Sequence, residues 1–307
     1  MKQAYDMLII GSGPAGMSAA VYAARAGMSA LIIEETGISG GQVLNTYEVD
    51  NYPGLPGISG FDLSVKMKEH VEKLGVKMQS DVVEKIINQD ELKLVVTNQA
   101  NYLAKTVVIA SGAQHAKLNI PGEEQLSGMG VSYCATCDGA FFRGKEVAVV
   151  GGGDVAVEDA IFLARFCEKV YLIHRRDKLR AAKSLQETLM KLPNVEIVWN
   201  SVVDEIVGED QVDGIRVSDT QTKKQTMLFI QGVFVAVGIV PNSNYLKGVV
   251  ALNEDGYVIA DESCETNIPG IYAAGDIRSK QLRQIITAAA DGANAVTSAE
   301  RYLMTLE

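Results

Sequence analysis

A Cys-x-x-Cys pair gives the sequence its clearest redox chemistry. Cys134 and Cys137 enclose two residues, and Asp138 follows directly. Such a pair forms either a reversible disulfide or half of a zinc site. Zinc needs four ligands, but Cys167 and Cys264 stand alone, with no second thiol or histidine at metal spacing. We therefore expect a redox-active dithiol and no metal, with a nearby acid that can tune thiolate formation.

Two glycine-rich turns supply a second kind of chemistry, the binding of nucleotide phosphates. Residues 7–35 and 147–175 align without a gap, and each contains an apolar strand, a glycine-rich turn, an amphipathic helix and a second apolar strand. This order is typical of the dinucleotide-binding βαβ unit, in which N–H groups at the start of the helix hold the pyrophosphate. One such motif alone is weak evidence, but two copies between strand and helix predict two nucleotide sites.

The residue at the end of the second strand of each copy determines whether the site accepts a ribose with free hydroxyls or one with a 2′-phosphate. In the first copy it is Glu34, whose carboxylate can accept hydrogen bonds from ribose hydroxyls. In the second copy the matching position begins the run His174, Arg175 and Arg176, with Arg180 one turn further on. A basic run is usually a solvated helix face, but guanidinium groups at this position suit a 2′-phosphate. We expect NADPH in the second copy and an adenine nucleotide without 2′-phosphate in the first.

The repeat continues beyond the glycine turns. Residues 106–112 resemble residues 232–238, and each is an apolar strand that closes with glycine. Alternating segments between the turns and these strands, such as 92–98 and 211–217, predict hairpins or meanders. The strand pattern is interrupted after each closing strand, at residues 111–117 and 238–244, and these segments are the natural linkers between two domains. The second nucleotide unit is therefore predicted to be inserted into the first.

The bulk composition is that of a globular protein, and the length suggests two domains of ordinary size. The chain has 307 residues, of which 47% are hydrophobic and 21% are charged. A net charge of −10 disfavours nucleic acid as a partner. No apolar run approaches the ~20 residues that cross a bilayer, and residues 1–6 lack the features of a signal peptide. We expect a cytoplasmic protein without a membrane or nucleic-acid partner.

Taken together, the motifs resemble those of the low-molecular-weight thioredoxin reductases over essentially the whole chain. They occur in the family's order, at residues 11–16 (GSGPAG), 40–42 (GGQ), 134–139 (CATCDG), 151–154 (GGGD), 174–176 (HRR) and 274–276 (AGD). The resemblance implies a homodimeric flavoenzyme that passes electrons from NADPH through FAD and the dithiol to the disulfide of thioredoxin. Two positions depart from the family: Ser111 replaces a usual Thr, and Val155 replaces a Ser or Thr that can contact phosphate.

The resemblance also assigns the cofactor sites by position. Contacts to FAD are expected at Gly11, Ser12, Gly13, Pro14, Ala15, Gly16, Glu34, Gly41, Gln42, Asn51, Asp276, Arg283, Gln284 and Ile285. Contacts to NADPH are expected at Gly151, Gly153, Asp154, His174, Arg175, Arg176 and Arg180. The helix after Gln284 should direct its N-terminus at the flavin, where the positive end of the helix dipole stabilises the reduced anion.

Within the dithiol the resemblance implies a division of labour. Cys137 would exchange electrons with the flavin, and Cys134 would attack the disulfide of the partner. Asp138 would handle the accompanying proton. Larger disulfide reductases use a C-terminal histidine for that proton, and residues 300–307 contain none.

The expected fold is α/β, with two Rossmann-like three-layer (ββα) domains, the second inserted into the first. The FAD-binding domain is expected at residues 1–112 and 244–307, and the NADPH-binding domain with the dithiol at 113–243. The dithiol and the nicotinamide must both reach one flavin, although both belong to the inserted domain. A rotation of that domain about the two connections would alternate them.

Two alternative interpretations stay open on the sequence. A flavin-dependent NAD(P)H reductase that serves a glutaredoxin-like protein or a peroxidase would contain the same dithiol. A non-enzymatic flavin-binding module would use the Cys-x-x-Cys pair only as a structural disulfide.

Overall fold

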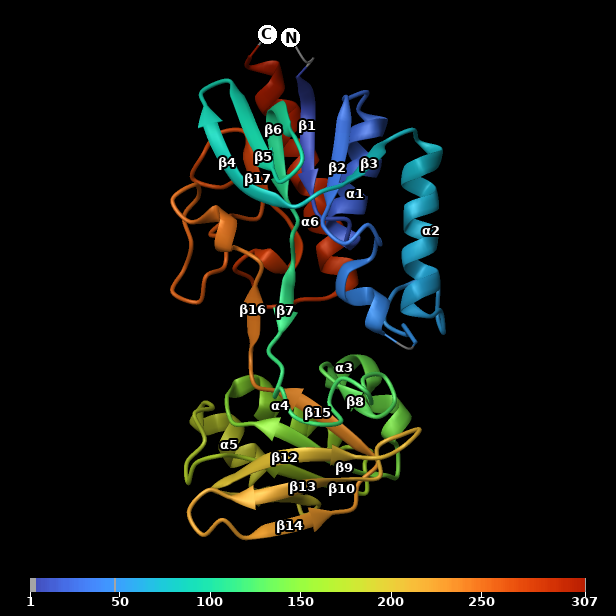
Figure 1. Ribbon diagram of the computed structural model, residues 1–307, viewed down its shortest axis with the longest axis vertical. Helices are drawn as coiled ribbons and strands as arrows, with labels where there is room; N and C mark the ends of the chain where they lie inside the picture. Colours follow the sequence, from blue (N-terminus) through green and yellow to red (C-terminus); the bar gives the residue numbers. More distant parts are fainter. Residues whose placement is uncertain (1–3, 47, 307) are drawn as a thin grey trace. The chain divides into compact units, whose positions relative to one another are not determined.

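The computed structural model describes residues 4–46 and 48–306 of the chain. The chain forms two compact units, each built from strands and helices (Figure 1). The first unit takes in the chain up to Leu44, Tyr52–Gln114 and the chain from Val240 onward. The second unit takes in Asn45–Asn51 and His115–Ile239.

The first unit is centred on a seven-stranded sheet with the order β3-β2-β1-β6-β5-β4, and β17 pairs with β6. Its strands are β1 (Tyr5–Ile10), β2 (Ala30–Glu34), β3 (Lys77–Ser80), β4 (Val83–Gln89), β5 (Leu92–Thr97), β6 (Asn101–Ile109) and β17 (Ile271–Ala273). The pairs within β3-β2-β1-β6 and the pair β17–β6 are parallel, whereas β4, β5 and β6 pair antiparallel. Met7, Leu8 and Ile9 of β1 are fully buried, because a central parallel strand is covered on both faces.

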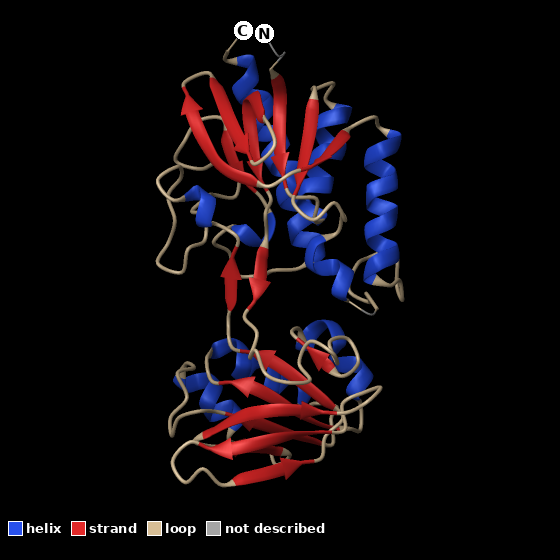
Figure 2. Cartoon of the chain, viewed as in Figure 1, coloured by secondary structure: helices blue, strands red, loops and turns tan. Residues whose placement is uncertain are grey.

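Three helices cover one face of this sheet (Figure 2): α1 (Pro14–Arg25), α2 (Gly60–Lys73) and α6 (Ile285–Met304). Met7 and Ile9 of β1 join these helices in one apolar core. Leu8 and Ile10, which point the other way, pack with residues of β4, β5 and the 246–258 segment. Small residues at the contact of α1 with α6 allow the two helices to approach closely, since a Cβ atom on Gly292 would lie 2.2 Å from the carbonyl oxygen of Ala15.

The second unit repeats the plan around a parallel sheet with the order β11-β10-β9-β15-β8. Its strands are β8 (Val131–Ser132), β9 (Glu146–Gly151), β10 (Lys169–Ile173), β11 (Val195–Val198) and β15 (Gly232–Ala236). The helices α3 (Ala135–Asp138), α4 (Asp154–Leu163) and α5 (Lys183–Leu189) and the 3₁₀ helix η2 (Gly139–Phe142) belong to this unit. An antiparallel sheet of β12 (Ser201–Val207), β13 (Gly214–Asp219) and β14 (Gln225–Leu228) completes it.

The core of the second unit has two halves, as a three-layer fold requires. Val147 and Val149 of β9 pack with α4 and α5, whereas Ala148 and Val150 pack with the β12-β13-β14 sheet. The predicted α/β fold class with Rossmann-like units is thereby confirmed. The alternating segment predicted at 211–217 forms a strand only from Gly214 onward.

The connections between the units near residues 113–115 and 239–241 run together as a two-stranded ribbon (Figure 1). It consists of β7 (Ala113–His115) and β16 (Ile239–Pro241). Beyond the strands, the N–H of Ala116 donates to Gly238 O at 2.9 Å and that of Asn242 donates to Gly112 O at 3.0 Å. Any movement of one connection is therefore shared by the other.

The contact of α1 with α6 yields a prediction in which two effects oppose each other. Helix propensity alone favours Gly292→Ala by about 1 kcal/mol. The new methyl group would meet backbone of α1, which no side-chain rotation can relieve, and overpacking of this kind costs about 1–3 kcal/mol. We expect Gly292→Ala to lower the midpoint of urea unfolding, and Thr297→Ala, exposed on the same helix, to leave it unchanged or slightly raised. A Gly292→Ala protein as stable as the parent would contradict the close packing.

Candidate flavin, nucleotide and dithiol sites

The glycine turn after β1 is shaped by a close backbone approach. Gly11 has a φ of +102°, and a Cβ atom there would lie 2.4 Å from the carbonyl oxygen of Ala110, just after β6. Gly13 caps α1 without a side-chain hydrogen bond, and Pro14 begins the helix. The N–H groups of the first turn therefore stay available to a phosphate. Ser12, Ala15 and Gly16 lie in the same turn, so the first predicted glycine motif forms one cradle.

Glu34, at the end of β2, is bound to this cradle. Its Oε2 accepts hydrogen bonds from Ser12 N at 2.8 Å and Ser12 Oγ at 2.6 Å. Its Oε1 accepts from the backbone N–H and the hydroxyl of Thr36, each at 3.1 Å. Glu34 thus lies beside the phosphate-binding turn, where a ribose is expected.

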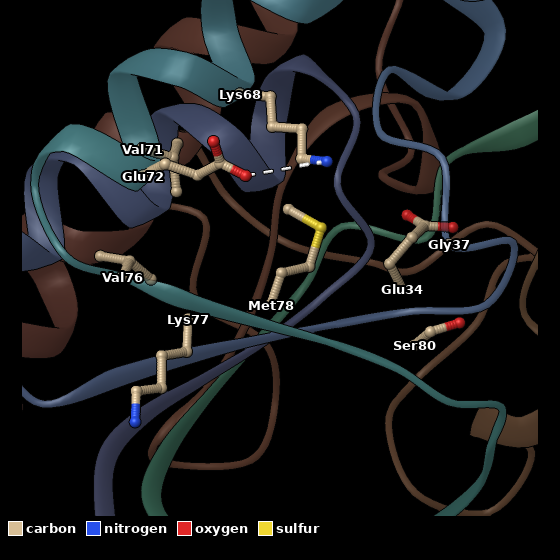
Figure 3. A pocket seen from close by; sticks show the side chains of 9 residues that line it. All are labelled: Glu34, Gly37, Lys68, Val71, Glu72, Val76, Lys77, Met78 and Ser80. Atoms are coloured by element: carbon tan, nitrogen blue, oxygen red, sulfur yellow. Dashed lines mark ion pairs between the residues drawn. The ribbon is translucent and has the colours of Figure 1, made fainter.

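A cavity of about 390 Å³ adjoins Glu34 (Figure 3). Figure 3 shows Glu34 and Ser80 on one side of it and the 3.7 Å ion pair of Lys68 with Glu72 on another. The remaining lining residues are Gly37, Val71, Val76, Lys77 and Met78. The cavity opens between the ends of β2 and β3 and helix α2, beside the expected adenosine site.

Buried polar atoms mark the rest of the expected FAD site. Asp276 lies in the 3₁₀ helix η4 (Gly275–Ile277), and among the described residues its buried Oδ1 has no hydrogen-bond partner. The buried Nε of Arg283 also has no hydrogen-bond partner among the described residues. The Arg283 guanidinium lies over the ring of Tyr257, 4.2 Å from the centroid. Burial raises the pKa of Asp276, while Lys280 and Arg283 act against that rise. Buried polar atoms of this kind suit a polar ligand such as FAD.

The other expected FAD contacts occupy three segments. Gly41 and Gln42 lie in the 3₁₀ helix η1 (Gly41–Asn45), and the side-chain amide of Gln42 donates to Ala113 O. Gln284 caps α6 through a capping box with Thr287, and Ile285 begins that helix. Asn51 is exposed in the segment Asn45–Asn51.

One residue of this region was missed by the sequence analysis. Asp291 of α6 is buried, and its carboxylate accepts from Gly275 N at 2.9 Å and from Lys280 Nζ at 2.8 Å, and lies 3.2 Å from Nη2 of Arg278. It thereby fixes the turn that carries Asp276. The available signal was a lone carboxylate in an otherwise small and apolar helix sequence, Ile285–Val296.

The second glycine turn makes the same close backbone approach as the first, although Gly151, unlike Gly11, does not have a positive φ. A Cβ atom on Gly151 would lie 2.4 Å from the carbonyl oxygen of Ala236, at the end of β15. Gly153 caps α4 without a side-chain hydrogen bond. Asp154, at the first position of α4, accepts a hydrogen bond from Ala182 N at 2.8 Å. The Asp154 carboxylate therefore ties the helix start to the loop that follows the basic run.

His174 is the buried member of the basic run. Its Nδ1 lies 2.9 Å from Gly151 O and its Nε2 lies 2.9 Å from Lys178 O, so the ring joins the glycine turn to the basic loop. Arg175, Arg176 and Arg180 are exposed. In the part of the chain that the structure describes, none of these three guanidinium groups forms an ion pair with a carboxylate. They suit the binding of a phosphate group from solvent.

The dithiol lies between β8 and η2, on the short helix α3. Cys134 caps this helix, and Cys134 and Cys137 form a disulfide with Cα atoms 5.3 Å apart. The hydroxyl of Thr136 lies 3.4 Å from Sγ of Cys134. Burial raises the pKa of Asp138, and a hydrogen bond from Ser132 acts against that rise. The geometry brings a disulfide and a buried carboxyl group with a raised pKa into one turn.

A buried glutamate that belongs to none of the sequence motifs organises the chain that leads to the dithiol. The Glu123 carboxylate accepts hydrogen bonds from the N–H groups of Leu118 and Asn119 at 2.9 and 2.7 Å and from the hydroxyl of Tyr133 at 3.0 Å. Burial and this carboxylate raise the pKa of Tyr133. Tyr133, next to Cys134, also stacks on His115, with ring centroids 5.5 Å apart.

Residues 4–46 and 48–306 offer neither a cluster of metal-ligating side chains nor a membrane-spanning helix. They contain no group of three or more His, Cys, Asp or Glu side chains placed to hold a metal ion. None of their helices combines the length and apolar character needed to span a membrane.

Comparison with known proteins identifies the family. The pyridine nucleotide-disulphide oxidoreductase family matches residues 5–292, and the chain belongs to it. The thioredoxin reductase of Bacillus subtilis is 46% identical over 307 residues, covering 100% of this chain and 97% of that protein. The thioredoxin reductase of Listeria monocytogenes is 45% identical, with 100% and 96% covered. The crystal structure of thioredoxin reductase from Streptococcus pyogenes is 48% identical, with a TM-score of 0.95 and coverage of 99% and 100%.

These similarities confirm the predicted resemblance and the predicted chemistry. The chain is an oxidoreductase that uses FAD and NADPH and a redox-active disulfide. The glycine cradles and the unpartnered Oδ1 of Asp276 fit such cofactors. The non-enzymatic interpretation is not favoured.

The cradle at Gly11 gives a direct prediction for cofactor binding. In Gly11→Ala the methyl group would meet the Ala110 carbonyl, and we expect the purified protein to retain less than about a tenth of its flavin, since the cradle must shift. Gly27→Ala is the matched control, because Gly27 also has a positive φ, +73°, but no atom lies within 4 Å of a Cβ there. Flavin absorbance per chain measures the outcome, and normal flavin content in Gly11→Ala would refute the role of the close approach.

Proposed function

We propose that the protein is a thioredoxin reductase, which transfers electrons from NADPH through FAD and the Cys134–Cys137 disulfide to the disulfide of thioredoxin. The observation that carries this proposal is a disulfide with a buried acid in the same unit as an NADPH-type glycine turn. The full-length similarity to thioredoxin reductases supports the choice of partner. A glutaredoxin-like protein or a peroxidase as the partner remains the second candidate, and nothing in the site favours it.

The residues of the chain divide the work of binding. The turn at Gly11–Gly16 and Glu34 would hold the FAD, with Asp276 toward its ribityl chain. The turn at Gly151–Gly153 would bind the pyrophosphate of NADPH, and the arginines near His174 would bind its 2′-phosphate. When bound, FAD supplies a two-electron relay between the nicotinamide and the disulfide.

The reduced dithiol would then carry out thiol–disulfide exchange. The Cys134 thiolate attacks one partner sulfur, and the other partner sulfur leaves as a thiolate that takes up a proton. Cys137 next attacks Sγ of Cys134, which re-forms the enzyme disulfide and releases the second partner thiolate. Two electrons pass to the partner, and Asp138 supplies a proton to a leaving sulfur. Its raised pKa keeps the carboxyl group protonated to higher pH than usual, which suits it to donate.

Both the dithiol and the NADPH-type turn belong to the second unit, whereas the FAD cradle belongs to the first. We therefore extend the proposal to a rotation of the second unit about the ribbon of β7 and β16. Such a rotation would present the nicotinamide and the disulfide to the flavin in turn. The paired connections support a movement of both strands together.

The proposal also includes the assembly and the compartment. A homodimer follows from the resemblance to the small thioredoxin reductases. A cytoplasmic location is proposed from the four cysteines, which are too few and too unevenly spaced for a secreted disulfide framework.

Replacing Cys134 separates the two halves of this function. In Cys134→Ser, NADPH should still bleach the flavin anaerobically, because hydride transfer does not use this sulfur. NADPH-dependent reduction of oxidised thioredoxin should fall by about a thousandfold or more, as for loss of a nucleophile. Cys167→Ser is the control, since Cys167 is buried and outside the dithiol. A Cys134→Ser protein that still reduces thioredoxin would contradict the assigned role.

The basic loop predicts the choice of nicotinamide cofactor. We expect Arg175→Gln combined with Arg176→Gln to raise KM for NADPH by about a hundredfold, because each lost hydrogen bond to a charged phosphate costs roughly tenfold in affinity. KM for NADH and kcat should change little. Arg165→Gln, which removes an exposed guanidinium at the end of α4, is the control. Equal losses with both cofactors would count against a 2′-phosphate site.

A further inference from the structure

Ser132 is a buried residue that no motif identifies, yet it contacts both ends of the dithiol turn. It is the last residue of β8 and is 5% exposed. Its Oγ donates to Oδ2 of Asp138 at 2.6 Å and accepts from the backbone N–H of Cys134 at 3.1 Å. The carbonyl oxygen of Cys134 lies 3.4 Å away. One hydroxyl group thus links the expected acid to the backbone of the cysteine expected to attack the partner.

The two oxygens of Asp138 are in different states. Oδ2 is held by Ser132, whereas Oδ1 is buried and has no hydrogen-bond partner among the described residues. A buried carboxylate oxygen without a partner is costly, so its presence calls for an explanation, and a catalytic role is one. The asymmetry leaves Oδ1 as the oxygen free to take up and release a proton.

The hydroxyl of Ser132 has only one hydrogen to donate. When Asp138 is ionised, that hydrogen goes to Oδ2, which is closer than the Cys134 carbonyl and charged. When Asp138 is protonated on Oδ1, the charge that strengthens this bond is lost, but the neutral carbonyl oxygen Oδ2 still accepts from Ser132, which lies closer to it than to the Cys134 carbonyl. The bond from Ser132 therefore becomes weaker, but persists, when Oδ1 takes up a proton.

We propose that Ser132 is a positioning residue for proton transfer in thiol–disulfide exchange: it holds Asp138 by Oδ2, so that Oδ1 exchanges the proton with the leaving sulfur. The inference rests on the proposed function and deepens it. The balance of the exchange is unchanged. Two electrons and two protons pass from the dithiol to the partner disulfide, and the proton given by Asp138 is recovered from the enzyme thiols.

The titration of Asp138 must be distinguished from that of other groups nearby. Helix α4 packs against α3 and carries Glu158 and Asp159. Burial and Glu158 raise the pKa of Asp159 to about 7. On its own turn, Asp138 is accompanied by Cys134 and Cys137, which do not titrate while they form the disulfide. The causes of the Asp138 shift are burial and, opposing it, Ser132, with no charged neighbour among them.

The experiment follows the carboxyl groups directly in the oxidised holoenzyme. Infrared difference spectra across a pH series record the carboxylic C=O band, which Asp138→Asn assigns to Asp138 and Asp159→Asn assigns to Asp159. In Ser132→Ala the Asp138 band should persist to higher pH than in the parent, because the hydroxyl that stabilises the carboxylate is gone. Ser298→Ala, which removes a buried hydroxyl on α6 that donates to the carbonyl oxygen of Ser263, should leave the band unchanged.

A second measurement follows the exchange itself. Enzyme reduced in advance is mixed with a small aromatic disulfide or with oxidised thioredoxin, and the single-turnover rate is recorded against pH. For Ser132→Ala we expect a loss of about tenfold, the effect of one hydrogen bond to a charged group, and a pH limb moved upward. KM for NADPH and flavin reduction by NADPH should stay at parental values, and Ser132→Thr should recover most of the rate.

The outcomes distinguish this inference from the proposed function. If the infrared shift and the slow exchange with the small disulfide occur but the parent enzyme does not reduce thioredoxin, the partner assignment fails and the role of Ser132 stands. If Ser132→Ala, or Ser132→Gly where the alanine variant does not fold, titrates and exchanges as the parent does, the positioning role is refuted. Equal behaviour of the alanine and threonine variants would also refute it.

Discussion

The structure depends on one steric constraint that occurs twice. In each unit a glycine, Gly11 directly after β1 or Gly151 at the end of β9, lies so close to the end of the closing strand that a Cβ atom would lie 2.4 Å from a carbonyl oxygen, that of Ala110 or that of Ala236. Only glycine permits this approach. It places the start of the following helix at the edge of the sheet, where its N–H groups can bind phosphate. The dithiol depends on the same strand, because β15 pairs with β9 on one side and with β8 on the other.

Burial is the second theme, and it affects the carboxyl groups near both redox centres. Asp138 beside the disulfide and Asp276 in the expected flavin site both have their pKa raised by burial, and each has one buried oxygen without a partner among the described residues. Their supports differ. Ser132, a neutral donor, holds Asp138, whereas the Asp291 carboxylate and Lys280 fix the turn that carries Asp276. A neutral support leaves a carboxyl group able to change its charge, and a fixed charged network favours a constant one.

Local sequence patterns predicted those features of the fold that depend on the conformation of a short stretch of backbone. The two glycine turns, the buried strands and the fold class follow from the spacing of apolar residues and glycine, because those features act within about thirty residues of each other. The function of single side chains did not follow in the same way. His174 stays a predicted NADPH contact, and the structure adds that its ring lies against Gly151 O and Lys178 O, a result of the basic loop folding back that no local pattern reveals. The role of Asp291 could not be predicted locally, because its partners, Gly275 and Lys280, lie on a separate turn.

The central claim is that one chain couples a flavin to the Cys134–Cys137 disulfide. Anaerobic reductive titration of the holoenzyme with dithionite tests it by counting electrons. Flavin and disulfide each accept two electrons, so complete reduction of the parent should need about two two-electron equivalents per flavin. The variant with both Cys134→Ser and Cys137→Ser should need about one. A parent protein that is fully reduced by a single equivalent would contradict the account, because the disulfide would then be isolated from the flavin.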